Sequence, residues 1–485
     1  MATIIRQTMI WLGLTRELPP GLAEVRTFLS CLGEFDEDLV RELAAERGHG
    51  RDDHPVRAIW NLLAIGLYLR NRNFAELLGE LQRNSDLARV LGFREIGPNL
   101  YDLPSDSAVS RFHRKMTSEY LSRVEAIFAR TAQVLAAENP EFGKHTALDA
   151  SDVRTHARPG SKKAEESQEG TRSEEVDAEQ EQAGVARSEG SEEQRAEGRE
   201  SSDPEASWSV KTKRWEDEQG KQRKETKSTF GYKLFAVSDT TIPGIVSVDV
   251  VTGSTSDQTM VNPMVEASMA NLGDSRMETM SMDKGFDSEG TVLESYEKGV
   301  AAVVPVRGVP KNLENQPRED REVSLVPGGN VVYDRYSGEV ACYEPAPSGQ
   351  EEPIRRTMTY AGFEAGRDAH KFRCPLGGSA ATLCSAFATC AAGPSGSQGR
   401  QTRVPLETDP RRFAPIYPRS KRWTRVYKGR TSVERINSFL KEVLQIERHY
   451  LRGRNAIKLR VLLASVTLNI RTLVSLRSQA VSEAA

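Results

Sequence analysis

One segment of the sequence places an acid between two cations at helical spacing. In Tyr427–Lys441 (YKGRTSVERINSFLK), a rotation of about 100° per residue puts Arg430, Glu434 and Lys441 within an arc of roughly 40°. The apolar residues of the segment fall on the opposite side, so one face is suited to packing and the other presents charge. A buried carboxylate is costly unless it is paired or bound to a metal. The segment therefore predicts a charged, hydrated site centred on Glu434.

The same residues allow a second interpretation, in which Glu434 is a capping residue. Thr431 and Glu434 have the spacing of a capping box, where a glutamate folds back onto the first turn of its helix. Tyr427 and Arg430 would then precede the helix. Spacing alone favours this interpretation, so the choice depends on the rest of the chain.

Two aspartates lie where predicted strands end. Asp149 closes a short predicted strand in Lys144–Ser151 (KHTALDAS), and Asp283 directly follows a predicted strand over Met277–Met282. An aspartate at a strand end is by itself as well explained as a turn or cap residue.

The residues around the second aspartate predict an α/β domain with a mixed sheet. Hairpin strands separated by a Pro-Gly turn are followed by alternating helices and strands. The predicted elements are strands over Phe230–Ser238, Ile245–Val251 and Ala301–Val306, and helices over Asp257–Leu272, Ser288–Lys298 and Ala456–Leu476.

Residues 22–140 predict an all-helical region. One of its helices is capped by Ser105 or Asp106. That helix carries four basic or titratable side chains, Arg111, His113, Arg114 and Lys115. A short helix, a turn and a capped basic helix resemble a helix-turn-helix DNA reader, with an ordinary helical bundle as the alternative.

Composition and charge favour a nucleic-acid partner. The 485 residues carry a net charge of −3, but residues 403–460 hold 16 basic and 5 acidic residues. Residues 161–206 hold 15 acidic and 6 basic residues and almost no large apolar ones, so we predict disorder there. We predict a cytoplasmic protein, because the apolar run near residues 59–69 is too short to span a bilayer and the N-terminus lacks a secretory pattern.

Residues 307–424 interrupt the regular pattern and hold four of the five cysteines. These four are candidate ligands of a structural metal: Cys342, Cys374, Cys384 and Cys390. Their spacing does not follow the tight pairs of structural zinc sites, so the metal is a hypothesis.

Taken together, these motifs resemble the DDE transposases of bacterial insertion sequences, over roughly residues 30 to 475. Members of that family carry an Asp closing a first strand, a second Asp in a strand-D-x-G-(Tyr/Phe) turn, and Y-x2-R-x3-E-x6-K around a third acid. Tyr427, Arg430, Glu434 and Lys441 stand at the spacings of that last motif.

The resemblance implies a ribonuclease H-like core in which Asp149, Asp283 and Glu434 bind two Mg²⁺ or Mn²⁺ ions. It also implies that Tyr427, Arg430 and Lys441 contact DNA. Neighbouring acids are rivals for the three positions: Asp152, Asp287 and Glu442.

The implied function is a DNA transposase that binds terminal inverted repeats and target DNA as a homodimer, without a membrane partner. It would cleave the phosphodiester bond at the ends of its element and transfer the exposed strand to target DNA. Two alternatives remain: a catalytically inactive transposase-derived DNA-binding protein, and a metal-dependent nuclease without strand transfer.

The predicted fold class is α/β, with a mixed-sheet core, an N-terminal all-helical domain and an irregular insertion. The predicted divisions are a helical, DNA-binding domain (1–140), the first core strand (141–157), an acidic disordered segment (158–206), catalytic core (207–306), insertion (307–424) and the C-terminal part of the core (425–485).

Overall fold

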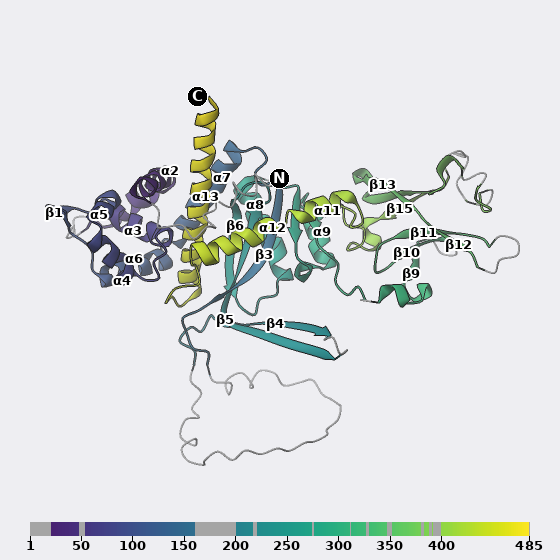
Figure 1. Ribbon diagram of the computed structural model, residues 1–485, viewed down its shortest axis with the longest axis horizontal. Coiled ribbons are helices and arrows are strands. Elements are labelled where there is room, and N and C mark those ends of the chain that lie inside the picture. Colours follow the sequence, from purple (N-terminus) through teal and green to yellow (C-terminus); the bar gives the residue numbers. More distant parts are fainter. Residues whose placement is uncertain are drawn as a thin grey trace, which may run out of the picture.

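The computed structural model describes residues 21–47, 54–160, 200–216, 221–273, 276–310, 312–325, 329–346, 352–379, 383–387, 390 and 399–484. A mixed sheet lies at the centre, between the N-terminal helices on one side and the insertion on the other (Figure 1).

The N-terminal region is helical, as predicted. Its helices are α2 (Leu22–Arg47), α3 (Val56–Tyr68), α4 (Phe74–Arg83), α5 (Ser85–Leu91), α6 (Asp106–Ser118) and α7 (Leu121–Glu138), with a small hairpin of β1 (Glu95–Gly97) and β2 (Leu100–Tyr101). Side-chain caps set several helix starts: Asn73 accepts from Glu76 N at 2.8 Å, and Ser105 accepts from Ala108 N at 3.2 Å. Ser105 is therefore the cap of the basic helix.

A long C-terminal helix, α13 (Arg454–Ala484), joins the N-terminal region to the sheet. It packs against α2, α3, α6, α7 and one edge strand of the sheet. Arg477 ties its end to two other helices, donating to Glu34 at 2.8 Å and to Glu138 at 2.9 Å. Within the described ranges, α13 alone is long and apolar enough to cross a membrane, and 72% of that apolar stretch is buried inside the protein. This burial is typical of a core helix.

The central sheet confirms the mixed α/β class. Its strands are β3 (His145–Arg154), β4 (Ser207–Glu216), β5 (Gln222–Asp239), β6 (Ile245–Thr252), β7 (Thr279–Met282) and β8 (Ala301–Val303). They are ordered β4-β5-β3-β7-β8, with β6 also paired to β5. β3 runs parallel to β7 and β7 parallel to β8, whereas the other pairings are antiparallel.

The strand β5 is longer than predicted, because its first half pairs with β4 instead of β6. The two strands project from the sheet as a two-stranded ribbon (Figure 1). Gly231 stands where the ribbon meets the sheet, with φ at 153°. A Cβ there would lie 2.3 Å from the carbonyl oxygen of Val153, so no larger residue fits this crossing.

Helices flank the sheet. α8 (Val261–Leu272) and α9 (Glu289–Glu297) connect its later strands, as predicted. α11 (Lys421–Lys428) and α12 (Thr431–Ser438) cross it, α12 over β5 and β3 and α11 over β7 and β8. The buried residues of β5, from Leu234 to Val237, show that both sheet faces are covered.

The insertion is irregular over much of its described length, as predicted, but it also contains two small antiparallel sheets that the sequence did not predict. It holds a sheet of β9 (Glu322–Ser324), β10 (Val331–Asp334), β11 (Val340–Glu344) and β12 (Ile354–Thr357), and a second of β13 (Thr359–Glu364), β14 (Ala369–Arg373) and β15 (Gln401–Pro405). Its strands span only three to six residues each, so any apolar alternation in them is too brief to mark a strand clearly in sequence.

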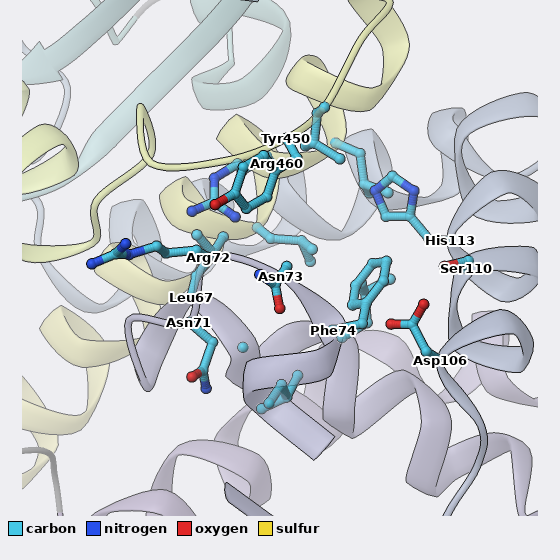
Figure 2. A pocket seen from close by; sticks show the side chains of 16 residues that line it. Leu67, Asn71, Arg72, Asn73, Phe74, Asp106, Ser110, His113, Tyr450 and Arg460 are labelled. Atoms are coloured by element: carbon cyan, nitrogen blue, oxygen red, sulfur yellow. The ribbon is translucent and has the colours of Figure 1, made fainter. Parts of the chain in front are cut away.

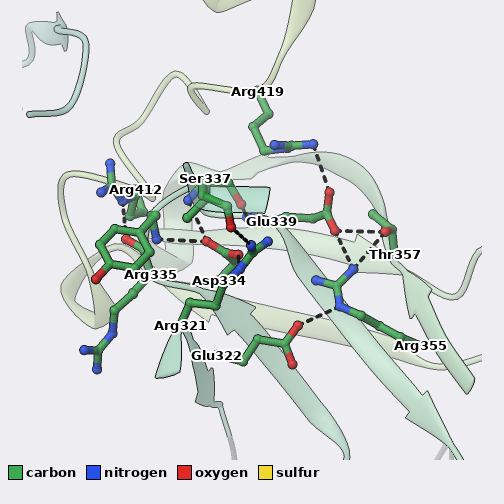
Figure 3. Close-up of polar contacts among 12 residues, drawn as sticks. Arg321, Glu322, Asp334, Arg335, Ser337, Glu339, Arg355, Thr357, Arg412 and Arg419 are labelled. Carbon is green, nitrogen blue, oxygen red and sulfur yellow. Dashed lines mark hydrogen bonds and ion pairs between the residues drawn. The ribbon is translucent and has the colours of Figure 1, made fainter. Parts of the chain in front are cut away.

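Charge pairs hold the insertion together and bind it to its surroundings. Glu339 pairs with Arg355 at 2.6 Å and with Arg419, just before α11, at 3.0 Å (Figure 3). Arg411 donates from Nε to Asp287 of the central domain at 3.0 Å. The insertion is thus anchored both to α11 and to the turn after β7.

Most of the acidic segment, residues 161–199, lies outside the described residues. Its predicted end is ordered, so the predicted boundary at 206 is wrong. Asp203 is 2% exposed, and its carboxylate accepts hydrogen bonds from Tyr232 at 2.6 Å, Thr155 at 2.5 Å and Gly453 N at 2.9 Å. These bonds seat residues 200–206 beside the sheet.

Candidate active site

The two predicted aspartates lie next to each other at the centre of the sheet. The parallel ladder of β3 and β7 ends at the pair Leu148 and Met282, and the next residues are Asp149 and Asp283. The prediction that the first strand ends at Asp149 is wrong, because β3 continues to Arg154 along β5. What ends at Leu148 is the pairing with β7, which leaves room for both carboxylates.

The surroundings of Asp149 disfavour its charged form. Burial raises its pKa, and the charge of Asp283 raises it further, although the Ala150 amide, Arg430 and Asn437 act in the opposite direction. Its Oδ2 accepts a hydrogen bond of 2.8 Å from Nδ2 of Asn437 on α12. Two carboxylates held this close take up either a proton or a cation.

Asp283 is fixed by the turn that follows it. Its Oδ1 accepts a hydrogen bond of 2.6 Å from the Gly285 amide and caps the short helix η3 (Lys284–Phe286). A Cβ on Gly285 would lie 2.6 Å from that oxygen, so the turn needs a glycine.

Glu434 lies on α12, which passes over Asp149, but its carboxylate is directed to Arg430. The two form an ion pair, and the Glu434 side chain is 52% exposed. The capping-box interpretation is wrong: Arg430 occupies the N-cap position, and the Thr431 hydroxyl donates to Lys428 O at 3.2 Å. Among the residues that the structure describes, no three His, Cys, Asp or Glu side chains are arranged to hold a metal, so Glu434 does not join the aspartates here.

Lys441 reaches the same neighbourhood from a widened helical turn. Residues Phe439–Val443 form a π-helix, so the regular 100° rotation does not extend to Lys441. Its Nζ donates to Asp152 O on β3 at 3.0 Å and pairs with Glu447 at 2.6 Å.

Tyr427 stacks on Trp423 and lies near the Arg430 guanidinium. Its ring lies 4.8 Å from that of Trp423, and the Arg430 guanidinium lies 6.0 Å from its centre. The predicted contacts of Tyr427, Arg430 and Lys441 with DNA stay predictions.

The rival acids have other partners. Burial raises the pKa of Asp152, but its bonds to Lys211 and Ser209 outweigh burial and hold the pKa below the usual range. The Asp287 side chain is 2% exposed and pairs with Arg411. Glu442 is exposed on the π-helix. These pairings favour Asp149 and Asp283 over Asp152 and Asp287. Glu434 is itself paired with Arg430 and half exposed, so its preference over Glu442 stays a prediction.

The basic helix α6 presents fewer cations than its sequence suggests. Burial lowers the pKa of His113 to about 4, and Lys115 pairs with Glu46 at 2.6 Å, whereas Arg111 and Arg114 are exposed. His113 lines a cavity of about 300 Å³ between the N-terminal helices and the C-terminal segment (Figure 2). None of the candidate catalytic acids lines that cavity. The helix-turn-helix stays a prediction that depends on the two arginines.

The four cysteines of the insertion lie within electrostatic reach of one another. Burial, together with the smaller effect of the other three thiols, raises the pKa of Cys342 to about 11. All are free of disulfides, and the described residues contain no group of three arranged for a metal. The structural metal stays a prediction.

The sequence did not reveal two polar features beside the aspartates, the amide of Asn437 and the pairing of Lys233 with Asp257, although the segments that hold Lys233 and Asp257 resemble family sequence. Asn437 is an amide on the apolar side of its helix, between Ile436 and Phe439, and this position is the signal that could have revealed it. Lys233 and Asp257 form an ion pair of 2.9 Å on the other side of the Asp283 turn.

The donor set suits a hard divalent cation. Mg²⁺ and Mn²⁺ prefer carboxylate oxygens, and a cation between Asp149 and Asp283 would offset the burial and the charge of Asp283 that raise the pKa of Asp149. Glu434, paired with Arg430, does not contribute a donor in this arrangement. Asp149 and Asp283 would therefore be the residues that hold such an ion.

Comparison with known proteins agrees with this geometry. Residues 140–470 match the family described as transposase DDE domain, which covers more than half of the chain and includes both aspartates and Glu434. No curated protein matches the chain.

Proposed function

The chain belongs to the DDE transposase family, with an α/β, ribonuclease H-like core and DNA as its substrate, and from that premise we propose the reaction it performs. It cleaves the phosphodiester bond at each end of a mobile element in a Mg²⁺- or Mn²⁺-dependent reaction. It then joins the exposed 3′-hydroxyl to target DNA.

The pairing of Asp149 with Asp283 carries this proposal. Two divalent ions, when bound, activate an attacking water or 3′-hydroxyl and stabilise the leaving oxygen. Asn437 orients the carboxylate of Asp149, and the Gly285 amide orients that of Asp283. The protein thus presents two carboxylates in preset positions.

The cations of α12 and of the following π-helix position the DNA backbone. Arg430 and Lys441 each pair with a glutamate, Glu434 and Glu447. A phosphate that takes Arg430 frees Glu434 to turn towards the aspartates. DNA binding then completes the ligand set, so cleavage depends on a seated substrate.

The basic C-terminal third and the exposed arginines of α6 supply further contacts to the terminal inverted repeats. Two ends must be held together before both are joined to one target, so the active form is a homodimer on DNA.

A strand-transfer assay tests the proposal. The substrate is the DNA that flanks the coding region, and Asp283→Asn is compared with Glu442→Gln, a matched change at an exposed acid. Wild type and Glu442→Gln should give joined products with Mg²⁺. Asp283→Asn should lose activity by about a thousandfold, because carboxylate–metal contacts contribute several kcal/mol to the transition state.

The assay also separates the alternatives. Cleaved ends without joined products would favour a nuclease. Binding without Mg²⁺-dependent nicking would favour a silent DNA-binding protein. Full activity of a folded Asp283→Asn variant would refute the site.

A further inference from the structure

A cleft of about 470 Å³ lies beside the turn that holds Asp283. Its wall includes Gly285 of that turn, Lys233 of β5 and the loop from Gly253 to Gln258. A Cβ on Gly285 would lie 2.6 Å from Asp283 Oδ1 and 3.6 Å from Asp257 Oδ2, so this backbone separates the catalytic carboxylate from the cleft. A group bound in the cleft would therefore lie across the Gly285 backbone from Asp283.

The opposite wall is the base of the β4–β5 ribbon. Trp208 and Val210 line the cleft and are 41% and 61% exposed. Strand pairing places Trp208 opposite Phe230, and the two rings are 5.4 Å apart. Phe230 thus supports one side of the indole, while the rest of it is open. An exposed indole held in this way is a surface on which a planar ring can stack.

The charges around the cleft suit a polyanion. Lys233 is 12% exposed, and its Nζ is held at 2.9 Å from Asp257 and 2.7 Å from Thr255 O. Arg307, also in the wall, is exposed. Farther along the ribbon, Lys224 lies on the same face as Trp208, because directly opposed and alternate residues of paired strands share a face.

We propose that this cleft seats an unpaired nucleotide of the DNA strand next to the cleavage site, with its base stacked on Trp208. Aromatic stacking beside a positively charged path is how proteins bind single strands with little regard to sequence. The inference rests on the proposed function, since it places part of the same DNA substrate. It adds that the protein holds the DNA end open.

A binding experiment tests this inference with DNA of arbitrary sequence. The probe is a fluorescein-labelled duplex with a short unpaired strand at one end, compared with the same probe carrying abasic sites in that strand. Ca²⁺ replaces Mg²⁺ to prevent cleavage. Wild type should bind the probe with bases about tenfold more tightly than the abasic probe, the size expected of one stacked base.

Trp208→Ala should remove that difference, and Trp208→Phe, which keeps a ring, should retain most of it. Val481→Ala, a change at an exposed residue of α13, should behave as wild type. Equal binding of both probes by wild type, or an unchanged preference in Trp208→Ala, would overturn the inference. Thermal melting of each variant verifies folding.

The outcome is separate from that of the strand-transfer assay. If the protein prefers the probe with bases but never joins DNA, the inference about the cleft stands and the proposed reaction is refuted. If the protein joins DNA but Trp208→Ala leaves its preference in the binding assay unchanged, the proposed reaction stands and the inference about the cleft is refuted.

Discussion

Asn437 Nδ2 donates a hydrogen bond of 2.8 Å to Oδ2 of Asp149, and this bond connects α12 to the centre of the sheet. The other amide atom, Asn437 Oδ1, is buried without a hydrogen-bond partner. A buried amide that satisfies only one of its groups is retained at a cost in stability. This amide fixes the position of Asp149 relative to α12.

Asn437→Ala should reduce DNA cleavage by about tenfold, the usual worth of a hydrogen bond to a charged group. It should also move the acid limb of the pH–rate profile to higher pH. The bond to Asn437 lowers the pKa of Asp149, so its loss lets the proton stay on at higher pH and compete with the metal. Cleavage rates over a pH series at fixed Mg²⁺ measure both effects, and an unmoved acid limb would contradict this role.

Glu434 and Arg430 should have opposite effects on metal affinity. Glu434→Gln removes the recruited ligand and should weaken Mn²⁺ binding, whereas Arg430→Gln frees Glu434 and should strengthen it in the absence of DNA. Arg430 also lowers the pKa of Asp149, so the titration is repeated over a range of pH to separate competition by the proton from competition for Glu434. Electron paramagnetic resonance of bound Mn²⁺ provides the measurement, with Glu442→Gln as control. Weaker Mn²⁺ binding by Arg430→Gln would argue against competition for Glu434.

Acid should destabilise the contact between the N-terminal helices and the C-terminal segment. Burial, followed by the charge of Arg460, lowers the pKa of His113 and of His449 to about 4. Both histidines are neutral in the folded protein but gain protons below about pH 6.5 when unfolded. Their stabilising contribution is therefore complete above pH 6.5 and is lost as the pH falls towards 4.

At about pH 5 this loss should reach on the order of 2 kcal/mol for each histidine, since one pKa unit is worth about 1.4 kcal/mol. Urea unfolding at pH 7.5 and pH 5 measures it. His113→Asn and His449→Asn should each flatten the pH dependence. A dependence as steep in the double variant as in wild type would assign the effect to other groups.

The cysteines of the insertion should bind one zinc ion. A bound metal would reverse the effect of burial on Cys342, because a coordinated thiol is deprotonated. Metal analysis of the purified protein should find zinc, and chelation should lower the melting temperature of the insertion. Cys384→Ser should reduce the zinc content, whereas Cys31→Ser, in α2, should not. A metal-free protein with unchanged folding would end the hypothesis.

Local sequence patterns predicted the elements whose surroundings are simple. The N-terminal helices, the β5–β6 hairpin and the strand before Asp283 follow from apolar periodicity and from turn residues. Asp283 was found because a strand and a glycine turn enclose it. Asp149 was placed correctly although its strand was ended too early, since only tertiary pairing shows that β3 leaves β7 and continues along β5.

Other features depend on contacts that no local pattern carries. The π-helix at Phe439–Val443 places Lys441 beside Asp152 by a route that a regular helix does not offer. The insertion packs an apolar cluster around Phe372 and Phe413 whose members come from short, separate segments, so no single stretch of its sequence reveals the core. Glu434 is directed to Arg430, a pairing that the helical spacing allowed but did not require.

The place of α13 has a consequence for how the protein is made. Its side chains Leu463, Ile470 and Leu473 belong to the same buried core as residues of α2, such as Phe28. During translation, the helices of residues 22–138 emerge long before α13, and until it arrives they lack part of their packing partner. The buried core of the N-terminal region is therefore complete only after α13 has been synthesised.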